Sequence, residues 1–193
     1  MGRKREFDEE KALDAAMQVF WKKGYHATSL TDLTTNMELQ RPSIYSAFGD
    51  KEKLFEAALR NYTKLHISNI RSKLQYNKSV KDTIRLFFED LVEEKCQGNQ
   101  NKGCFCINTM VELAPHDEKF EILTREHQMY LSVIFQEMIQ NGIQSGEFHR
   151  DLDAKALAQT LVVSLIGITV LMKSRPERSF IDNAIISTLS LLK

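Results

Sequence analysis

The spacing of apolar side chains is the feature that most constrains this chain. Along most of its 193 residues, apolar side chains recur at intervals of three and four, which is the period of one face of an α-helix. Such a face covers residues 8–22 through Ala12, Ala16 and Phe20. No stretch alternates apolar and polar residues for long enough to indicate a strand, and only three prolines and eight glycines interrupt the pattern. We therefore expect an all-α fold.

About nine helices are expected, and local signals mark several of their ends. Gly24 suits the C-cap of the first helix, and Ser29 with Asp32 has the spacing of a capping box. Pro42 is tolerated in the first turn of the third helix, and Asp50 suits the N-cap of a long fourth helix. The predicted helices cover residues 8–22, 29–36, 40–48, a long segment after residue 50, then 79–96, 104–114, 117–142, 154–173 and 179–192.

Charge and cysteine content limit the class of protein. The net charge is zero, so composition alone does not indicate a nucleic-acid partner, although Arg3, Lys4 and Arg5 form a basic cluster. Three cysteines do not make a disulfide framework and favour a reducing cytosol. The charged N-terminus lacks the apolar core of a signal peptide, and the apolar run over residues 161–172 is too short to span a bilayer. We expect a cytoplasmic protein with no membrane partner.

Residues 28–48 predict two short helices joined by a tight turn, the arrangement of a helix-turn-helix that binds double-stranded DNA. Arg41 can bind guanine in a bidentate way, and Gln40 can read adenine. Phosphate contacts, which fix register, suit the hydroxyl and lysine side chains nearby, and the basic cluster suits phosphates or the minor groove. The predicted DNA-binding residues are Arg3, Lys4, Arg5, Thr28, Ser29, Gln40, Arg41, Pro42, Ser43, Tyr45, Ser46 and Lys51. On pattern alone, a helical scaffold for protein contacts or for a membrane surface stays open.

Three runs of sequence make the DNA-binding interpretation specific: FWKKGY at residues 20–25, ATSL at 27–30 and PSIYSAFGDKEKLF at 42–55. With them, residues 7–59 resemble the DNA-binding domain of the TetR family of bacterial regulators. The resemblance is weaker over residues 103–109 and 142–148. It implies a DNA-binding domain over residues 1–50, and a helical domain over 51–193 that encloses a ligand cavity and dimerises through its last two helices.

Two positions depart from the family pattern. Glu38 stands in the helix-helix turn where the family usually has glycine, and Thr34 stands where it usually has alanine. A positive φ at Glu38 would cost of order 1 kcal/mol. Neither change removes the resemblance, but we expect the turn to be slightly reshaped.

The last two predicted helices also indicate a homodimer from their residues alone. The helix over residues 154–173 is apolar around nearly its whole circumference and so must be covered on all sides. A four-helix interface between two subunits would cover it, and the alternative is an internal helix of a monomer. The predicted interface residues are Leu161, Leu165, Ile168, Met172, Ile181, Ile185, Leu189 and Leu192. Such a dimer would set two recognition helices about 34–36 Å apart on a palindrome.

An effector site is expected in the larger domain, lined by aromatic, soft and a few polar side chains: Tyr62, His66, Phe87, Phe88, Phe105, Asn108, Met110, Tyr130 and Met138. This mixture indicates a small, largely apolar organic effector. Cys104 and Cys106 stand near a predicted helix start, where the dipole lowers a thiol pKa, and Cys96 precedes a polar loop. A thiol sensor of oxidants or electrophiles is therefore an alternative. Ordinary buried cysteines are the simpler interpretation, and a soft-metal site is the least favoured because Cys-x-Cys in a helix points its sulfurs apart.

Enzyme signatures are missing from the sequence. It contains no HExxH, no glycine-rich phosphate loop and no GxSxG, and its five histidines are dispersed. We therefore expect no catalytic activity, no cofactor and no metal. The prediction is a repressor that a small organic effector releases from a palindromic operator.

Overall fold

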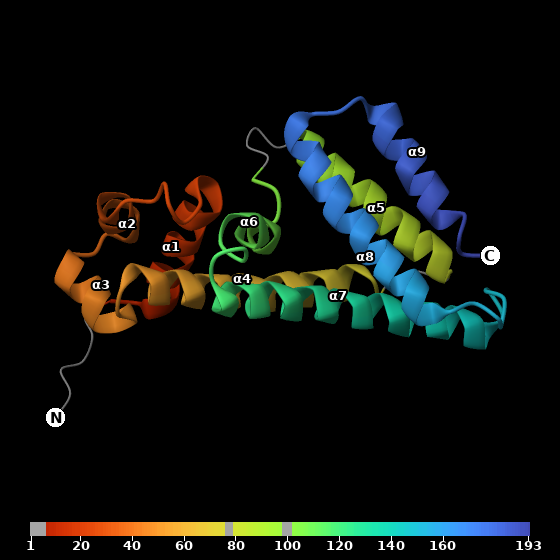
Figure 1. The fold of residues 1–193 in the computed structure, drawn as a ribbon, viewed down its shortest axis with the longest axis horizontal. Helices are drawn as coiled ribbons and strands as arrows, with labels where there is room; N and C mark the ends of the chain where they lie inside the picture. The colour runs from red at the N-terminus through yellow and green to blue at the C-terminus, as the bar shows by residue number, and fades with distance from the viewer. Residues whose placement is uncertain (1–6, 76–78, 98–101) are drawn as a thin grey trace. The chain divides into compact units, whose positions relative to one another are not determined.

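The computed structural model describes residues 7–75, 79–97 and 102–193. Within these ranges the chain forms nine α-helices, one short 3-10 turn and no strand, which confirms the predicted all-α fold (Figure 1). The helices are α1 Glu9–Lys23, α2 Leu30–Met37, α3 Arg41–Phe48, α4 Lys51–Lys73, α5 Val80–Gln97, α6 Phe105–Glu112, α7 Glu118–Ser145, α8 Ala154–Leu171 and α9 Arg178–Leu189. Arg3, Lys4 and Arg5 lie outside the described residues.

Local caps place the helix ends close to the predicted positions. Ser29 and Asp32 form the expected capping box at the start of α2, each side chain binding the backbone N–H of the other. The Asp50 carboxylate accepts a hydrogen bond from the backbone N–H of Lys53 at 2.8 Å in the first turn of α4. Gly24 ends α1 with a φ of 81°, a conformation that glycine adopts without strain.

The chain divides into two compact units. The first unit contains residues Met1–Leu65 and Cys104–Thr124, and the second contains His66–Gly103 and Arg125–Lys193. The first unit therefore holds more than the predicted DNA-binding domain, because α6 and the beginnings of α4 and α7 belong to it. A functional boundary at residue 50 stays a prediction.

Phe55 is the centre of an aromatic cluster in the first unit. Its ring meets four others edge to face, with centroid distances of 4.9 Å to Phe20, 5.2 Å to Tyr25, 5.2 Å to Phe105 and 5.4 Å to Phe120. Such pairs contribute about 0.5–1.5 kcal/mol each beyond their buried area. The cluster therefore joins α1, α4, α6 and α7 around one side chain.

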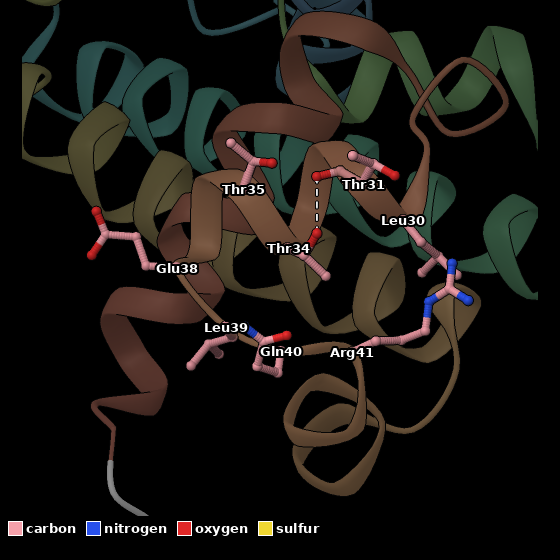
Figure 2. Close-up of a pocket in the computed structure, with 8 residues that line it drawn as sticks. All are labelled: Leu30, Thr31, Thr34, Thr35, Glu38, Leu39, Gln40 and Arg41. Atoms are coloured by element: carbon pink, nitrogen blue, oxygen red, sulfur yellow. Dashed lines mark hydrogen bonds between the residues drawn. The ribbon is translucent and has the colours of Figure 1, made fainter.

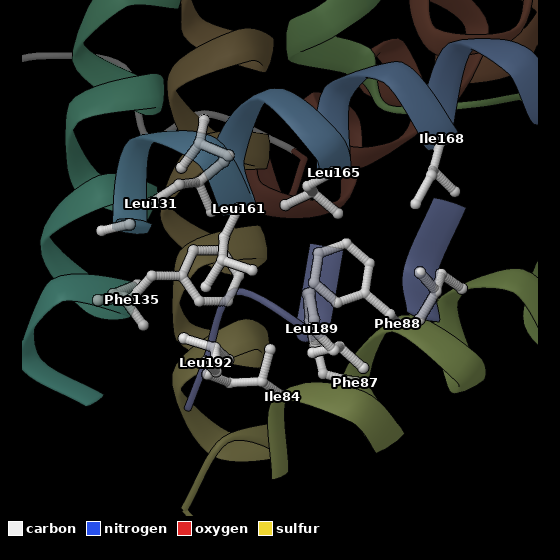
Figure 3. Close-up of a cluster of buried hydrophobic side chains, with 14 of the residues drawn as sticks. Ile84, Phe87, Phe88, Leu131, Phe135, Leu161, Leu165, Ile168, Leu189 and Leu192 are labelled. Atoms are coloured by element: carbon white, nitrogen blue, oxygen red, sulfur yellow. The ribbon is translucent and has the colours of Figure 1, made fainter. Parts of the chain in front are cut away.

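The core of the second unit is built from α5, α7, α8 and α9, together with Ile70 from the end of α4 (Figure 3). Phe88 and Phe135 stack with their rings 6.4 Å apart, and Leu165 and Leu189 pack into the same cluster. The labelled members are Ile84, Phe87, Phe88, Leu131, Phe135, Leu161, Leu165, Ile168, Leu189 and Leu192. This packing accounts for much of the apolar character of α8, which by length and composition alone is a candidate membrane span.

All eight residues predicted to form a dimer interface lie inside this core. Leu161, Leu165, Ile168, Met172, Ile181, Ile185, Leu189 and Leu192 are each 1–6% exposed. The prediction was wrong for these side chains, because their own chain already covers them. A helix that is apolar all round gives no indication of which side faces its own core. Other apolar side chains on the same helices are exposed, led by Val163 at 70% and Ile186 at 65%.

Candidate nucleic-acid interface

The turn between α2 and α3 fixes the geometry of the helix-turn-helix. Glu38 adopts the left-handed conformation, with φ 54° and ψ 35°, which is the case for which a cost of order 1 kcal/mol was expected. Leu33, Met37 and Ile44 hold the two helices against the rest of the unit, at 0%, 6% and 2% exposure. Because these three side chains point inward, the opposite face of α3 must point outward.

The outward face of α3 carries the predicted base-reading side chains. Gln40, Arg41, Pro42 and Ser46 are exposed, as is Tyr45, and Ser43 is half-buried. Arg41 makes no ion pair with any described residue, so its guanidinium donors face solvent. Gln40 begins the helix without a side-chain cap. Pro42 has no backbone N–H and the N–H of Ser43 donates to the Gln40 carbonyl at 2.9 Å, so within the first turn the N–H of Arg41 is the donor left for an anion.

An open hollow of about 520 Å³ lies along α2 and the turn (Figure 2). Its lining residues are Leu30, Thr31, Thr34, Thr35, Glu38, Leu39, Gln40 and Arg41. Sequence reasoning missed the three threonines, of which Thr31 and Thr35 are exposed. The available signal was their spacing of four residues, which places two hydroxyls on one side of α2. The hollow therefore combines hydroxyl donors with Arg41 on one surface.

The hydroxyls of two predicted phosphate contacts, Thr28 and Ser29, are hydrogen-bonded to neighbouring residues of their own chain. Thr28 is only 2% exposed, and its hydroxyl donates to the carbonyl oxygen of Gly24 at 2.6 Å. The prediction for Thr28 was wrong, because this hydroxyl closes the loop between α1 and α2. Ser29 is exposed, but its hydroxyl donates to the Asp32 carboxylate at 2.8 Å and accepts from the Asp32 backbone N–H at 3.1 Å.

Charges at the start of α2 are paired. The ammonium of Lys23 lies 2.5 Å from Asp32. The hydrogen bond from Lys23, followed by those from Ser29, lowers the pKa of Asp32 well below its ordinary value. Asp32 therefore stays ionised and keeps the capping box intact at neutral pH.

Lys51, at the first position of α4, is held against an aromatic ring. Its ammonium lies 4.4 Å from the centroid of the Tyr25 ring, in cation–π geometry. Burial lowers the pKa of Lys51, and the charge of Glu112 opposes that shift. The side chain is half-buried. Because it rests on the Tyr25 ring, its position depends on the loop that carries Tyr25.

The predicted effector-site residues are divided between the two units. In the first unit, Tyr62 and Phe105 are buried with rings 5.6 Å apart, and Asn108 and Met110 are half-buried on α6. Burial raises the pKa of Tyr62, and its hydroxyl donates to the Sγ of Cys104 at 3.3 Å. These four side chains stay candidates.

In the second unit, Phe87 and Phe88 are core residues and Met138 packs against that core. Tyr130 is 53% exposed, which does not fit the lining of an enclosed pocket. His66 Nδ1 lies 3.1 Å from Nε2 of His127. Sequence reasoning missed His127, because an isolated histidine in a helix carries no pattern that predicts its burial. His127 is 2% exposed, and burial, then the charge of His66, lowers its pKa to about 3.

The two described cysteine side chains are buried. Cys104 is the N-cap residue of α6 at 5% exposure, and Cys106 is 2% exposed. Burial raises the pKa of the Cys106 thiol, so the expectation that the helix start lowers it was wrong for this residue. Desolvation outweighs the helix dipole there. The side chain of Cys96 lies outside the described residues.

Comparisons with known proteins agree over the whole chain. Residues 12–58 match the family described as bacterial regulatory proteins, tetR family, and residues 81–185 match the tetracyclin repressor-like C-terminal domain. An uncharacterised HTH-type transcriptional regulator, YezE of Bacillus subtilis (strain 168), is 30% identical and covers 100% of both chains. The HTH-type transcriptional repressor ComR of Escherichia coli (strain K12) is 31% identical over 88% of this chain and 81% of its own.

Solved structures agree with the sequence matches. A cysteine mutant of the TetR family transcriptional regulator CifR, complexed with 26-base-pair operator DNA, is 29% identical, has a TM-score of 0.84 and covers 100% of both chains. Sequence and fold thus agree along the full length, and the chain belongs to the tetR family of bacterial regulatory proteins.

Proposed function

We propose that the protein is a cytoplasmic repressor that binds a palindromic operator as a homodimer and leaves it when a small organic effector binds. The family consists of DNA-binding transcriptional regulators rather than enzymes. The outward face of α3 carries the proposal, because Gln40, Arg41 and Tyr45 are exposed while Ile44 anchors the helix. The repressor name of ComR and the operator DNA bound by CifR support it.

The chemistry of this face suits DNA recognition in two ways. Arg41 presents a planar set of donors that matches O6 and N7 of guanine, and Gln40 matches adenine; such pairs discriminate by about 1–3 kcal/mol. The hydroxyls of Thr31 and Thr35 and the backbone N–H of Arg41 offer donors to phosphates, which fix register. Lys51 is proposed as a further phosphate contact.

The test begins with a duplex that the wild-type protein selects from a random-sequence pool. Arg41→Lys keeps the positive charge but loses the bidentate fork, so binding to the selected duplex should fall about 5- to 150-fold. Binding to unselected DNA, and the slope of affinity against salt, should stay close to those of the wild type. Gel-shift titrations at two salt concentrations measure both quantities. Selection of no duplex, or affinity independent of salt, would contradict the proposal.

The homodimer is proposed from a patch on the second unit. Val163, Val170 and Leu171 on α8 are 41–70% exposed, and Phe180 and Ile186 on α9 are 59% and 65% exposed. The two helices pack side by side (Figure 1). Large exposed apolar side chains on two paired helices favour a protein interface. A second copy of the chain is the proposed partner, since the same patch on two subunits forms a twofold interface.

The effector is proposed to be small and largely apolar, because the candidate side chains that remain are mostly aromatic or soft. The factor by which the effector weakens DNA binding is limited by how much more tightly it binds the DNA-free conformation of the dimer than the DNA-binding one. A compound that binds the protein but leaves operator affinity unchanged in a gel-shift titration is not the effector.

A further inference from the structure

The carboxylate of Glu112 binds the loop between α1 and α2. Its Oε2 accepts the backbone N–H of Tyr25 at 3.0 Å, and its Oε1 accepts the backbone N–H of His26 at 2.8 Å. Glu112 is the last residue of α6, 86 residues beyond His26 along the chain, and both segments belong to the first unit. One side chain thus holds two successive amides of the loop that leads into α2.

The surroundings of Glu112 favour a specific role over a chance contact. A glutamate at a helix C-terminus is opposed by the helix dipole, so α6 itself gains nothing from this residue. Hydrogen bonds to an ionised carboxylate are roughly twice as strong as neutral ones. A Cβ at Gly24 would come within 2.7 Å of Oε2 of Glu112, so the absence of a side chain there lets the carboxylate approach.

The held loop supports two parts of the DNA-binding surface. It continues through Thr28, whose hydroxyl binds the Gly24 carbonyl, to Ser29, the N-cap of α2. The ring of Tyr25 packs against Phe55, with centroids 5.2 Å apart, and lies beneath the ammonium of Lys51. Fixing the Tyr25 backbone therefore fixes the platform on which Lys51 rests.

We infer that Glu112 is a positioning residue for DNA binding, which ties α6 to the α1–α2 loop and thereby sets the start of α2 and the placement of Lys51. The inference rests on the proposed function, in that α2, α3 and Lys51 contact the operator. Glu112 itself is not proposed to contact DNA. Its structural effect passes through the two loop amides, beside the direct action of its charge on Lys51.

If Glu112 acted only through its charge, its removal would strengthen operator binding, whereas the positioning role predicts weaker binding. Removing a negative charge from a DNA-binding unit strengthens binding to phosphates. Glu112→Gln keeps the shape but offers one acceptor instead of two, and Glu112→Ala offers none. Operator affinity should fall about threefold for Glu112→Gln and about tenfold for Glu112→Ala, given that a tenfold change corresponds to only 1.4 kcal/mol. Glu118→Gln is the control, because it removes the same charge from an exposed residue of the same unit.

Affinity is measured by fluorescence anisotropy on the duplex that the wild-type protein selects. Hydrogen exchange followed by NMR supplies the second readout. The amides of Tyr25 and His26 should exchange faster in Glu112→Gln, while the amide of Gly49, bonded to the Tyr45 carbonyl, should not change. A general loss of stability would instead move all three amides.

Folded Glu112→Gln protein that binds DNA as tightly as Glu118→Gln would overturn the inference, as would weaker binding with unchanged exchange at Tyr25 and His26. If Glu112→Ala does not fold, Glu112→Gln alone decides. If the wild type selects no duplex, the proposed function fails, whereas the exchange measurement still shows whether the carboxylate holds the loop.

Discussion

At the scale of single residues, several side chains near the proposed DNA-binding surface serve the local backbone. Thr28 closes a loop, Ser29 caps a helix, and Glu38 occupies a left-handed position. These roles follow from atoms within a few residues of each side chain. They leave the predicted contacts that are exposed on α3 and at its N-cap, which are Gln40, Arg41, Pro42, Tyr45 and Ser46.

Glu38 predicts a change in stability. Glu38→Gly should raise the free energy of unfolding by up to about 1 kcal/mol, because glycine adopts φ 54° without the clash that Cβ causes. Glu38→Gln keeps the Cβ and should gain only the few tenths expected from removing a negative charge at a helix C-terminus. Urea unfolding measures both variants. Equal stability of the two would show that the turn carries no backbone strain.

His127 predicts a dependence on pH. Its folded pKa of about 3 lies below the ordinary value of 6.5, so only the unfolded chain binds this proton between those values. The free energy of unfolding is therefore unaffected by this proton above pH 6.5 and falls as the pH is lowered from 6.5 toward 3. Stability should drop by about 1 kcal/mol between pH 7.5 and 5.5. In His127→Gln this part of the drop should vanish, whereas the exposed control His149→Gln should keep it; urea unfolding at both pH values decides.

At the scale of elements, helix ends were predictable, whereas the buried faces of α8 and α9 were not. Ser29, Asp32 and Asp50 act on backbone amides within three residues, so their pattern fixes where α2 and α4 begin. The start of α5 was also predicted, yet the carboxylate that caps it belongs to Glu147, which accepts the N–H groups of Val80 and Lys81 at 2.8 Å. A contact across 66 residues leaves no local signal.

In the candidate site, too, residues with a local sequence signal were predicted and residues with distant partners were not. The exposed face of α3 follows from helical period and the resemblance, so Arg41 and Tyr45 were found. Glu112 and His127 were missed, because each gains its role from a partner 61 to 87 residues away. On α8 and α9 the apolar pattern covers every side, so sequence periodicity cannot separate the core face from an exposed one. The structure shows that Leu165 lies inward and that Val163 is exposed.

At the scale of the whole molecule, the exposed patch on α8 and α9 predicts how the subunits associate. Ile186→Glu places a charge on a side chain that is 65% exposed in one chain, so the isolated fold should tolerate it. Within a dimer interface the same charge would be buried without a partner, which costs several kcal/mol. Sedimentation should therefore show a monomer, with circular dichroism unchanged.

Val133→Glu on α7 is the matched control, because this apolar side chain is 47% exposed on a helix outside the patch. It should sediment as the wild-type dimer does. A monomeric Ile186→Glu variant presents one recognition helix at a time, so it should bind the full selected duplex no more tightly than a single half-site. A dimeric Ile186→Glu variant would place the subunit contact elsewhere on the chain. A monomeric variant that keeps full operator affinity would instead separate DNA recognition from dimerisation.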